Sequence, residues 1–306
     1  MSEQALTQIL PYLPPLLRQL LGGLDDEVWA ELEEIRLKSQ QPPLLRLHQG
    51  ERLLSEYTVS SAELHKTLLL LAESSLYAFD EQLRRGYITL PGGHRVGLSG
   101  RAVLERGAIR ALKEISSINI RIARHLSGVA APLLPHLCDE AGAPRQSLLI
   151  SPPQAGKTTL LRDIARIFAD GDGVPPLRVG VVDERSELAA TRGGVAALPL
   201  GLRADVLDGA PKGEGIALLL RSMSPQLLIC DELGGVADAE ALRDAANAGV
   251  RVIASAHGAS AAELRRRPLL RSILEEGCFE RLLILSRRSG PGTLEAVYDG
   301  QGRQLC

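Results

Sequence analysis

The sequence predicts an α/β protein in which a mostly parallel sheet follows a smaller domain of mixed α/β structure. In the second half of the chain, short apolar runs alternate with stretches of helical periodicity. This alternation is typical of parallel strands covered by helices on both faces. In the first half, helical stretches precede strand-like segments around tight turns, which favours a mostly antiparallel sheet. A length of 306 residues agrees with about two domains.

The composition is that of an ordinary globular protein, with 45% hydrophobic and 24% charged residues. A formal net charge of −2 removes the simplest argument for a nucleic-acid binder, which would usually show a strongly basic domain. The four cysteines lack metal-ligand spacing, so we expect free thiols. The first residues lack a signal-peptide pattern, and no apolar run reaches the roughly 18–20 residues of a spanning helix. We therefore expect a cytoplasmic protein that contacts a membrane only through a partner.

The first domain, predicted over 1–140, contains both helical and strand-like segments. Helical periodicity runs through about Glu34, and Ser61 is the expected cap of one or two helices within 61–85. The turn at Pro91, Gly92 and Gly93 separates two strands. Strands are predicted at 35–38, within 43–54, within 87–103 and at 118–124. A polar, proline-bearing stretch at 139–146 marks the boundary with a second domain over 141–306.

The second domain alternates short strands with helices. Strands are predicted at 147–150, 178–182, 227–230 and 250–256, and helices at about 157–168, 213–222 and 237–249. The last residues, 300–306, are expected to form a loose tail. Ligands of such sheets bind beyond the carboxyl ends of the strands. Each polar motif of this domain follows one of those ends.

A phosphate-binding loop is the strongest functional signal in the sequence. Backbone N–H groups of the loop and the positive end of the next helix can bind the phosphates of ATP. Lys157 is expected between the β- and γ-phosphates, and the Thr158 hydroxyl is expected on Mg²⁺. Ser151 stands where the general pattern has glycine, which predicts backbone strain on the order of 1 kcal/mol. The nucleotide-binding candidates are Ser151, Pro152, Pro153, Gln154, Ala155, Gly156, Lys157, Thr158 and Thr159.

Two pairs of carboxylates end predicted strands of this domain. Asp231 and Glu232 follow an apolar run; the first is a candidate magnesium ligand, and the second can polarise the attacking water. Asp183 and Glu184 follow the strand before it. Glu184, or alternatively Asp183, is a candidate base, and Asp183 is also a candidate metal ligand. Carboxylates from two adjacent strand ends are then expected to face one Mg-phosphate centre.

A histidine and an arginine complete the predicted catalytic set. His257 follows the fourth strand and lies in the same row as the acidic pairs, which favours a sensor of the γ-phosphate or of a subunit interface. An arginine commonly neutralises the charge of the γ-phosphoryl transition state. Arg221, which closes a helix just before the Asp231 strand, is the preferred candidate. Weaker candidates are Arg203 in this domain and Arg95, Arg121 and Arg124 in the first domain.

These motifs in this order resemble the secretion ATPases of type II and type IV systems, and more closely still the stage III sporulation protein AA family. The resemblance covers nearly the whole chain. It implies a RecA-like P-loop core behind an N-terminal domain, and a homo-oligomeric ring, expected to be a hexamer, with ATP at the subunit boundaries. It further implies an ATPase at the cytoplasmic, mother-cell face of a channel linking mother cell and forespore. Membrane-embedded channel or secretion proteins are the implied partners.

Two other functions remain open from the residues alone. One is a P-loop ATPase acting on nucleic acid, because fold does not fix function. A basic strip could be formed by Arg101, Arg106, Arg110, Lys113, Arg121 and Arg124. The neutral charge balance argues against this alternative, and we do not expect a nucleic-acid partner. The other is a scaffold that assembles on binding ATP and barely hydrolyses it; the two intact acidic pairs favour turnover instead.

Overall fold

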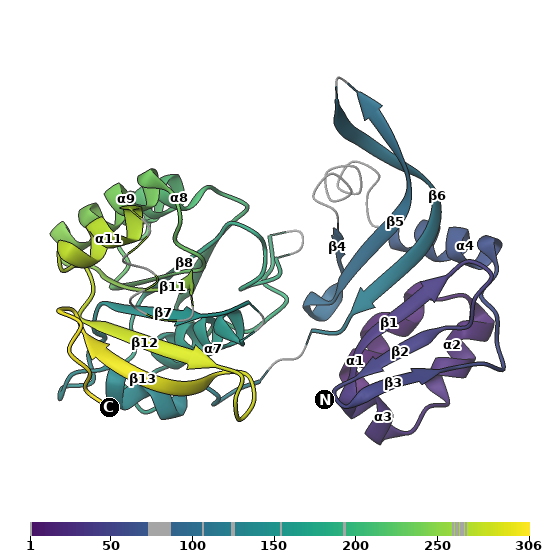
Figure 1. The fold of residues 1–306 in the computed structure, drawn as a ribbon, viewed down its shortest axis with the longest axis horizontal. Helices are drawn as coiled ribbons and strands as arrows, with labels where there is room; N and C mark the ends of the chain where they lie inside the picture. The colour runs from purple at the N-terminus through teal and green to yellow at the C-terminus, as the bar shows by residue number, and fades with distance from the viewer. Residues whose placement is uncertain are drawn as a thin grey trace. The chain divides into compact units, whose positions relative to one another are not determined.

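The chain divides into two compact units, Met1–Arg124 and His125–Cys306. The computed structural model, drawn in Figure 1, describes residues 2–72, 87–105, 107–123, 126–153, 155–191, 194–258, 260, 263, 266 and 268–306. The division lies earlier in the chain than the boundary at 140/141 predicted from sequence. The reason is that Ala130, Leu133 and Leu137 pack in the core of the second unit.

The first unit is built on a six-stranded sheet with the order β3-β2-β1-β6-β5-β4. Every pairing in it is antiparallel, as the turns in the sequence predicted. The strands are β1 Leu32–Lys38, β2 Leu44–Leu47, β3 Gly50–Leu53, β4 Tyr87–Thr89, β5 Arg95–Glu105 and β6 Ala108–Arg121. The helices are α1 Ser2–Ile9, α2 Pro15–Gly22, α3 Asp26–Glu31 and α4 Ser61–Ala72, with short 3-10 turns at Leu10–Tyr12 and Pro91–Gly93.

Two boundaries in this unit differ from the sequence prediction. β1 begins at Leu32, where helix was expected through about Glu34, because Leu32, Ile35 and Leu37 are needed in the core of the sheet. The cap of α4 is Ser60 rather than Ser61. The Glu63 N–H donates to Ser60 Oγ (3.2 Å), and the Ser60 N–H donates to Glu63 Oε2 (2.9 Å), a reciprocal capping box. The rest of the helical prediction, beyond Ala72, lies outside the described residues.

The second unit contains a seven-stranded sheet with the order β13-β12-β7-β11-β10-β8-β9. Only β13 runs antiparallel to its neighbour; the other pairings are parallel. The strands are β7 Ser147–Ser151, β8 Val179–Asp183, β9 Ala204–Asp208, β10 Leu227–Cys230, β11 Arg251–His257, β12 Arg281–Ser286 and β13 Thr293–Asp299. The helices are α6 Leu134–Leu137, α7 Lys157–Asp170, α8 Lys212–Ser222, α9 Val236–Asn247 and α11 Pro268–Glu275, with a 3-10 turn at Ala131–Leu133.

Helices cover both faces of this sheet, which confirms the predicted α/β architecture. On one face α8, α9 and α11 pack against alternate strand residues such as Leu228 and Cys230. On the other face α7 and the segment around α6 pack against the intervening residues, such as Leu227 and Ile229. Strands buried on both sides read as continuous apolar runs, which explains why LLIC and SLLI were recognisable in the sequence.

The C-terminal residues pair with β13 instead of forming the loose tail expected from sequence. The Leu305 N–H donates to the Val297 carbonyl (2.7 Å), and the Val297 N–H donates to the Cys306 carbonyl (3.1 Å). Arg303 also binds Asp299, which its Nε reaches at 2.7 Å. The tail therefore covers what would otherwise be an unpaired edge strand. No helix in the described part of the chain is long and apolar enough to cross a bilayer.

A buried histidine joins three segments of the first unit. His94 is 1% exposed. Its Nδ1 accepts the Ala123 N–H at 3.0 Å, so the ring proton resides on Nε2, which lies 3.1 Å from Gln8 Oε1. Burial lowers the pKa of His94 to about 4. The folded unit thus holds the neutral imidazole.

This histidine makes the stability of the first unit depend on pH. The unfolded chain binds a proton at His94 near pH 6.5, whereas the folded chain binds one only near pH 4. The contribution of neutral His94 to the unfolding free energy is therefore fully present above pH 6.5 and is lost as the pH falls. Between pH 7 and pH 5, we expect His94 to cost about 2 kcal/mol of unfolding free energy.

The measurement is urea unfolding at both pH values, followed by the fluorescence of Trp29, the single tryptophan of the chain, which is buried in this unit. His94→Gln should lose most of the difference, whereas His65→Gln, at an exposed position, should keep it. An unchanged pH dependence in His94→Gln would contradict the assignment.

Candidate functional site

The predicted phosphate-binding loop connects β7 to α7 at the carboxyl edge of the sheet. Gly156 caps α7 in the left-handed conformation, with φ of 85°. A Cβ atom there would lie 3.2 Å from Pro291 Cβ and 3.3 Å from the Gly292 nitrogen, so the position requires glycine on two grounds. The Gly292 N–H also donates to the Ala155 carbonyl (2.9 Å), which joins the loop to the segment before β13. Gln154, a predicted loop ligand, lies outside the described residues.

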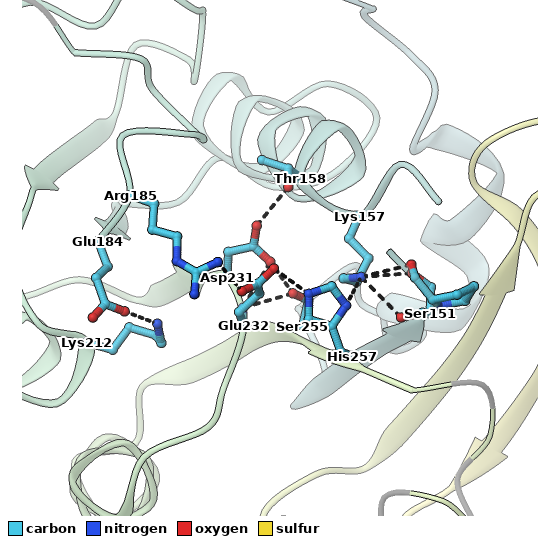
Figure 2. A network of polar contacts seen from close by, with 11 residues as sticks. Ser151, Lys157, Thr158, Glu184, Arg185, Lys212, Asp231, Glu232, Ser255 and His257 are labelled. Carbon is cyan, nitrogen blue, oxygen red and sulfur yellow. Dashed lines mark hydrogen bonds and ion pairs between the residues drawn. The ribbon is translucent and has the colours of Figure 1, made fainter. Parts of the chain in front are cut away.

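Lys157 is buried and faces only hydrogen-bond acceptors. Its Nζ lies 3.2 Å from the Ser151 carbonyl, 3.0 Å from Ser151 Oγ and 3.3 Å from the Pro152 carbonyl. Figure 2 shows these contacts together with His257, whose Nδ1 is 3.2 Å from the same Nζ. Burial lowers the pKa of Lys157, while the negative charges of Asp231 and Glu232 oppose the shift. The ammonium therefore lies where it can exchange these neutral partners for phosphate oxygens.

The backbone strain predicted for Ser151 is absent. Ser151 is the last residue of β7, pairs with His257 of β11, and is not among the described residues with positive φ. Extended backbone accommodates a serine at no steric cost, so the expectation derived from the glycine pattern was wrong. Its hydroxyl, fully buried, instead adds an acceptor for Lys157.

Thr158 and Asp231 meet across the site. Thr158 Oγ1 donates to Asp231 Oδ2 at 2.8 Å. The Ser255 hydroxyl of β11 donates to the other carboxylate oxygen, Oδ1. Mg²⁺ prefers hard oxygen ligands and commonly binds through one or two protein groups, with water and phosphate completing its octahedron. A threonine hydroxyl beside an aspartate fits this requirement.

His257 connects Lys157 to Glu232. A lysine ammonium can only donate, so His257 Nδ1 is the acceptor and the ring proton lies on Nε2. That Nε2–H donates to Glu232 Oε1 at 2.6 Å. The neutral Nε2–H tautomer is thereby fixed by its two neighbours. From the sequence, His257 was expected at the same edge of the sheet as the two acidic pairs. The structure places it between Lys157 and Glu232 (Figure 2).

Asp183 does not face the other carboxylates, contrary to the sequence expectation. It is 2% exposed, and it accepts the backbone N–H groups of Glu187 (2.7 Å), Leu188 (3.0 Å) and Ala189 (2.8 Å). Burial raises the pKa of Asp183, and these hydrogen bonds oppose the shift. The carboxylate therefore orders the loop after β8, and it is not placed to bind a metal.

Glu184 is turned toward Lys212, the first residue of α8, with which it forms an ion pair. Lys212 is buried, whereas about 40% of the Glu184 side chain is exposed. Figure 2 places this pair at one side of the network, beyond Arg185. Of Glu184 and Glu232, the two glutamates expected to act on the attacking water, Glu232 is therefore the one that the structure brings to Lys157 and Asp231.

Arg221 is not brought to the site. It lies exposed in the last turn of α8, whose first residue contacts Glu184 at the carboxyl edge; the helix therefore carries Arg221 toward the start of β10. Arg203 donates to the Ala169 carbonyl instead (3.0 Å). Arg95 and Arg121 belong to the first unit, and Arg124 lies outside the described residues.

Sequence reasoning missed three residues of this network: Ser255, Lys212 and Arg185. Arg185 Nη1 lies 2.6 Å from Glu232 Oε2, and it belongs to the acidic segment DERSE itself. Ser255 lies two residues before His257, so strand alternation placed both on the same side of β11. No local signal marks Lys212, because its pairing depends on the position of α8.

The sequence profile of a family described as sporulation stage III, protein AA, matches residues 3–305. The stage III sporulation protein AA of Bacillus subtilis (strain 168) is 43% identical over 301 residues, which cover 98% of this chain and 97% of that protein. Protein SEEDLING PLASTID DEVELOPMENT 1 of Arabidopsis thaliana is 28% identical over 98% of this chain, but this covers only 42% of the plant protein.

Two solved structures are similar in fold. The ATPase DotB of Legionella pneumophila superposes with a TM-score of 0.57 at 17% identity, covering 93% of this chain and 80% of that one. The pilus retraction motor PilT with bound ADP gives a TM-score of 0.56 at 13% identity, covering 87% and 78%. These likenesses confirm the predicted fold class, a RecA-like core behind an N-terminal domain.

The backbone conformation of Ser151 predicts which of two substitutions, Ser151→Gly or Ser151→Ala, destabilises the protein more. Because Ser151 has extended backbone, glycine relieves no strain there and loses more conformational entropy on folding than alanine does. We expect Ser151→Gly to be less stable than Ser151→Ala by about 0.5–1 kcal/mol. Both variants lose the hydroxyl, so the difference between their urea unfolding curves reports the backbone and the buried Cβ, and not the lost hydrogen bond. A more stable glycine variant would show that the backbone at this position is strained after all.

Proposed function

This chain belongs to the sporulation stage III, protein AA, family, and we propose that it is a Mg²⁺-dependent ATPase that hydrolyses ATP to ADP and phosphate. The observation that carries the proposal is the convergence of Lys157, Thr158, Asp231, Glu232 and His257 at one edge of the sheet. These residues come from three segments that lie far apart in the sequence. A buried lysine, a hydroxyl–carboxylate pair and a further carboxylate are the groups that phosphoryl transfer to water requires.

Each residue then has a part in the reaction. The first N–H groups of α7 and the Lys157 ammonium bind the phosphates, and Lys157 leaves Ser151 and His257 to do so. Thr158 and Asp231 would hold Mg²⁺, which would supply positive charge to the phosphates of ATP. Glu232 accepts the proton of the attacking water, and the neutral His257 orients the Glu232 carboxylate. Glu184 is not assigned the base, since its ion pair with Lys212 turns it away from Lys157 and Asp231.

The family membership supports a role in sporulation. We propose that the ATPase powers assembly of, or transport through, a channel complex between mother cell and forespore. It is proposed to act as a homo-oligomeric ring at the cytoplasmic, mother-cell face, with membrane-embedded channel proteins as partners. The similar solved chains are an ATPase and a pilus retraction motor by name, which agrees with a motor function for this fold.

The nucleic-acid alternative gains no support from the described basic residues of the first unit. Arg101 Nη1 lies 3.3 Å from Glu114 Oε1, and Arg110 Nη1 lies 3.3 Å from Glu105 Oε1. These pairs compensate two positive charges of the strip. Arg106 and Arg124, which would extend it, lie outside the described residues.

The proposal predicts Mg²⁺-dependent release of phosphate from ATP, measured per subunit over a wide range of protein concentration. Lys157→Ala should abolish hydrolysis, and Glu232→Gln should lower kcat by about 10²-fold because the base is lost while binding is kept. A specific rate that rises with concentration supports sites completed between subunits. Wild-type activity equal to that of Lys157→Ala at every concentration would reject hydrolysis by the isolated protein and favour the ATP-gated scaffold.

Asp231 and Asp183 have different surroundings, so replacing each by asparagine should change a different property of the protein. Asp231→Asn should raise the Mg²⁺ concentration for half-maximal hydrolysis about tenfold or more, because one charged ligand is lost. Asp183→Asn should leave that concentration within about twofold and instead lower the unfolding free energy by about 1–3 kcal/mol, since it disturbs buried hydrogen bonds. A raised Mg²⁺ requirement in Asp183→Asn would show that this residue does approach the metal.

A further inference from the structure

Arg185 holds the carboxylate of the proposed base from the side opposite His257. We propose that Arg185 is a positioning residue that fixes the Glu232 carboxylate for ATP hydrolysis; the inference rests on the proposed function. Arg185 Nη1 lies 2.6 Å from Glu232 Oε2, and His257 Nε2 lies 2.6 Å from Glu232 Oε1. Figure 2 shows the carboxylate between these two donors.

These two contacts hold the Glu232 carboxylate but do not use all of its hydrogen-bond acceptor capacity. Each carboxylate oxygen can accept about two hydrogen bonds, so one donor on each leaves capacity for a water molecule. The backbone of Glu232 is held as well. Its φ of 49° lies in the left-handed region, and its N–H is shared between Asp231 Oδ1 (2.9 Å) and Ser255 Oγ (3.0 Å). A residue other than glycine keeps this conformation only where its surroundings impose it.

The backbone of the loop that carries Arg185 is held in place by hydrogen bonds from two sides. Asp183 binds three backbone N–H groups of the residues that follow Arg185. From the other side Arg162, which is 6% exposed on α7, donates to the carbonyls of Leu188 (2.6 Å) and Glu187 (2.7 Å). The loop that presents Arg185 is thus tied to β8 and to the helix that begins with Lys157. Because the backbone is already ordered, binding the carboxylate costs only the rotamer entropy of the Arg185 side chain, and the planar guanidinium limits that cost per hydrogen bond.

The two anchors of Glu232 differ in their dependence on nucleotide. His257 contacts Lys157 through its other ring nitrogen, so the surroundings of His257 change when phosphate takes Lys157. The contact between Arg185 and Glu232 involves neither Lys157 nor His257. Arg185 is therefore the anchor that keeps the carboxylate in place while Lys157 changes partners. A small displacement of the reacting Glu232 carboxylate is expected to lower kcat strongly, without changing the affinity for ATP.

The test compares steady-state ATP hydrolysis by full-length wild type, Arg185→Met and Arg185→Lys. We expect Arg185→Met to lower kcat at least tenfold with KM for ATP within about twofold, and Arg185→Lys to recover part of kcat because it keeps the positive charge. Arg271→Met is the matched control. Arg271, which is about as exposed as Arg185, pairs with Glu275 on α11 at 2.7 Å, outside the site, and this variant should keep the wild-type rate.

A double-mutant cycle separates positioning from contact with phosphate. In a Glu232→Gln background, Arg185→Met should lower kcat by no more than about twofold further, because the group that Arg185 positions is already gone. Binding of a fluorescent ATP analogue by each variant verifies that the site is folded. A full or increased kcat in Arg185→Met, or an undiminished effect in the Glu232→Gln background, would overturn the inference. Wild type without any hydrolysis would instead reject the proposed function, and this inference with it.

Discussion

The parallel pairing of β7, β11, β10 and β8 is the constraint on which the candidate site depends. In this sheet Ser151 lies opposite His257, and Cys230 lies between Ala254 and Val182. The four strands run in one direction, so the residues after their carboxyl ends share one edge. A shift of register by one residue would turn every side chain to the opposite face. Burial of both faces makes such a shift costly, which keeps the polar edge in place.

The polar edge is a network in which each charge has a partner. Glu232 lies between Arg185 and His257, and Glu184 is paired with Lys212. Lys157 is surrounded by carbonyl and hydroxyl oxygens and a ring nitrogen. In a partly buried site, unpaired charges are expensive and paired ones interact strongly. An entering phosphate can therefore displace the neutral partners of Lys157 without breaking the Arg185–Glu232 pair.

Asp183 and Asp231 show how similar local sequences acquire different roles. Both end a buried apolar strand and are followed by glutamate. After β8 the chain turns back, so backbone N–H groups point at Asp183 and enclose it. After β10 the chain leaves through Gly234 and Gly235, whose N–H groups bind Asp238 of α9 instead. Asp231 thus remains open toward Thr158, and the direction of the following loop decides which aspartate can reach a metal.

The sequence by itself determined the alternation of strands and helices in the second unit, the loop that leads from β7 into α7, and the location of Asp231, Glu232 and His257 at strand ends. These features follow from local periodicity and from residue types at fixed spacing. Only the tertiary structure decided that Ser151 is unstrained, that residues 300–306 pair with β13, and that Arg221 lies at the end of α8 far from the site. It also brought in Arg185, Lys212 and Ser255. The roles of these residues depend on contacts between segments far apart in the chain, and local patterns carry no information about such contacts.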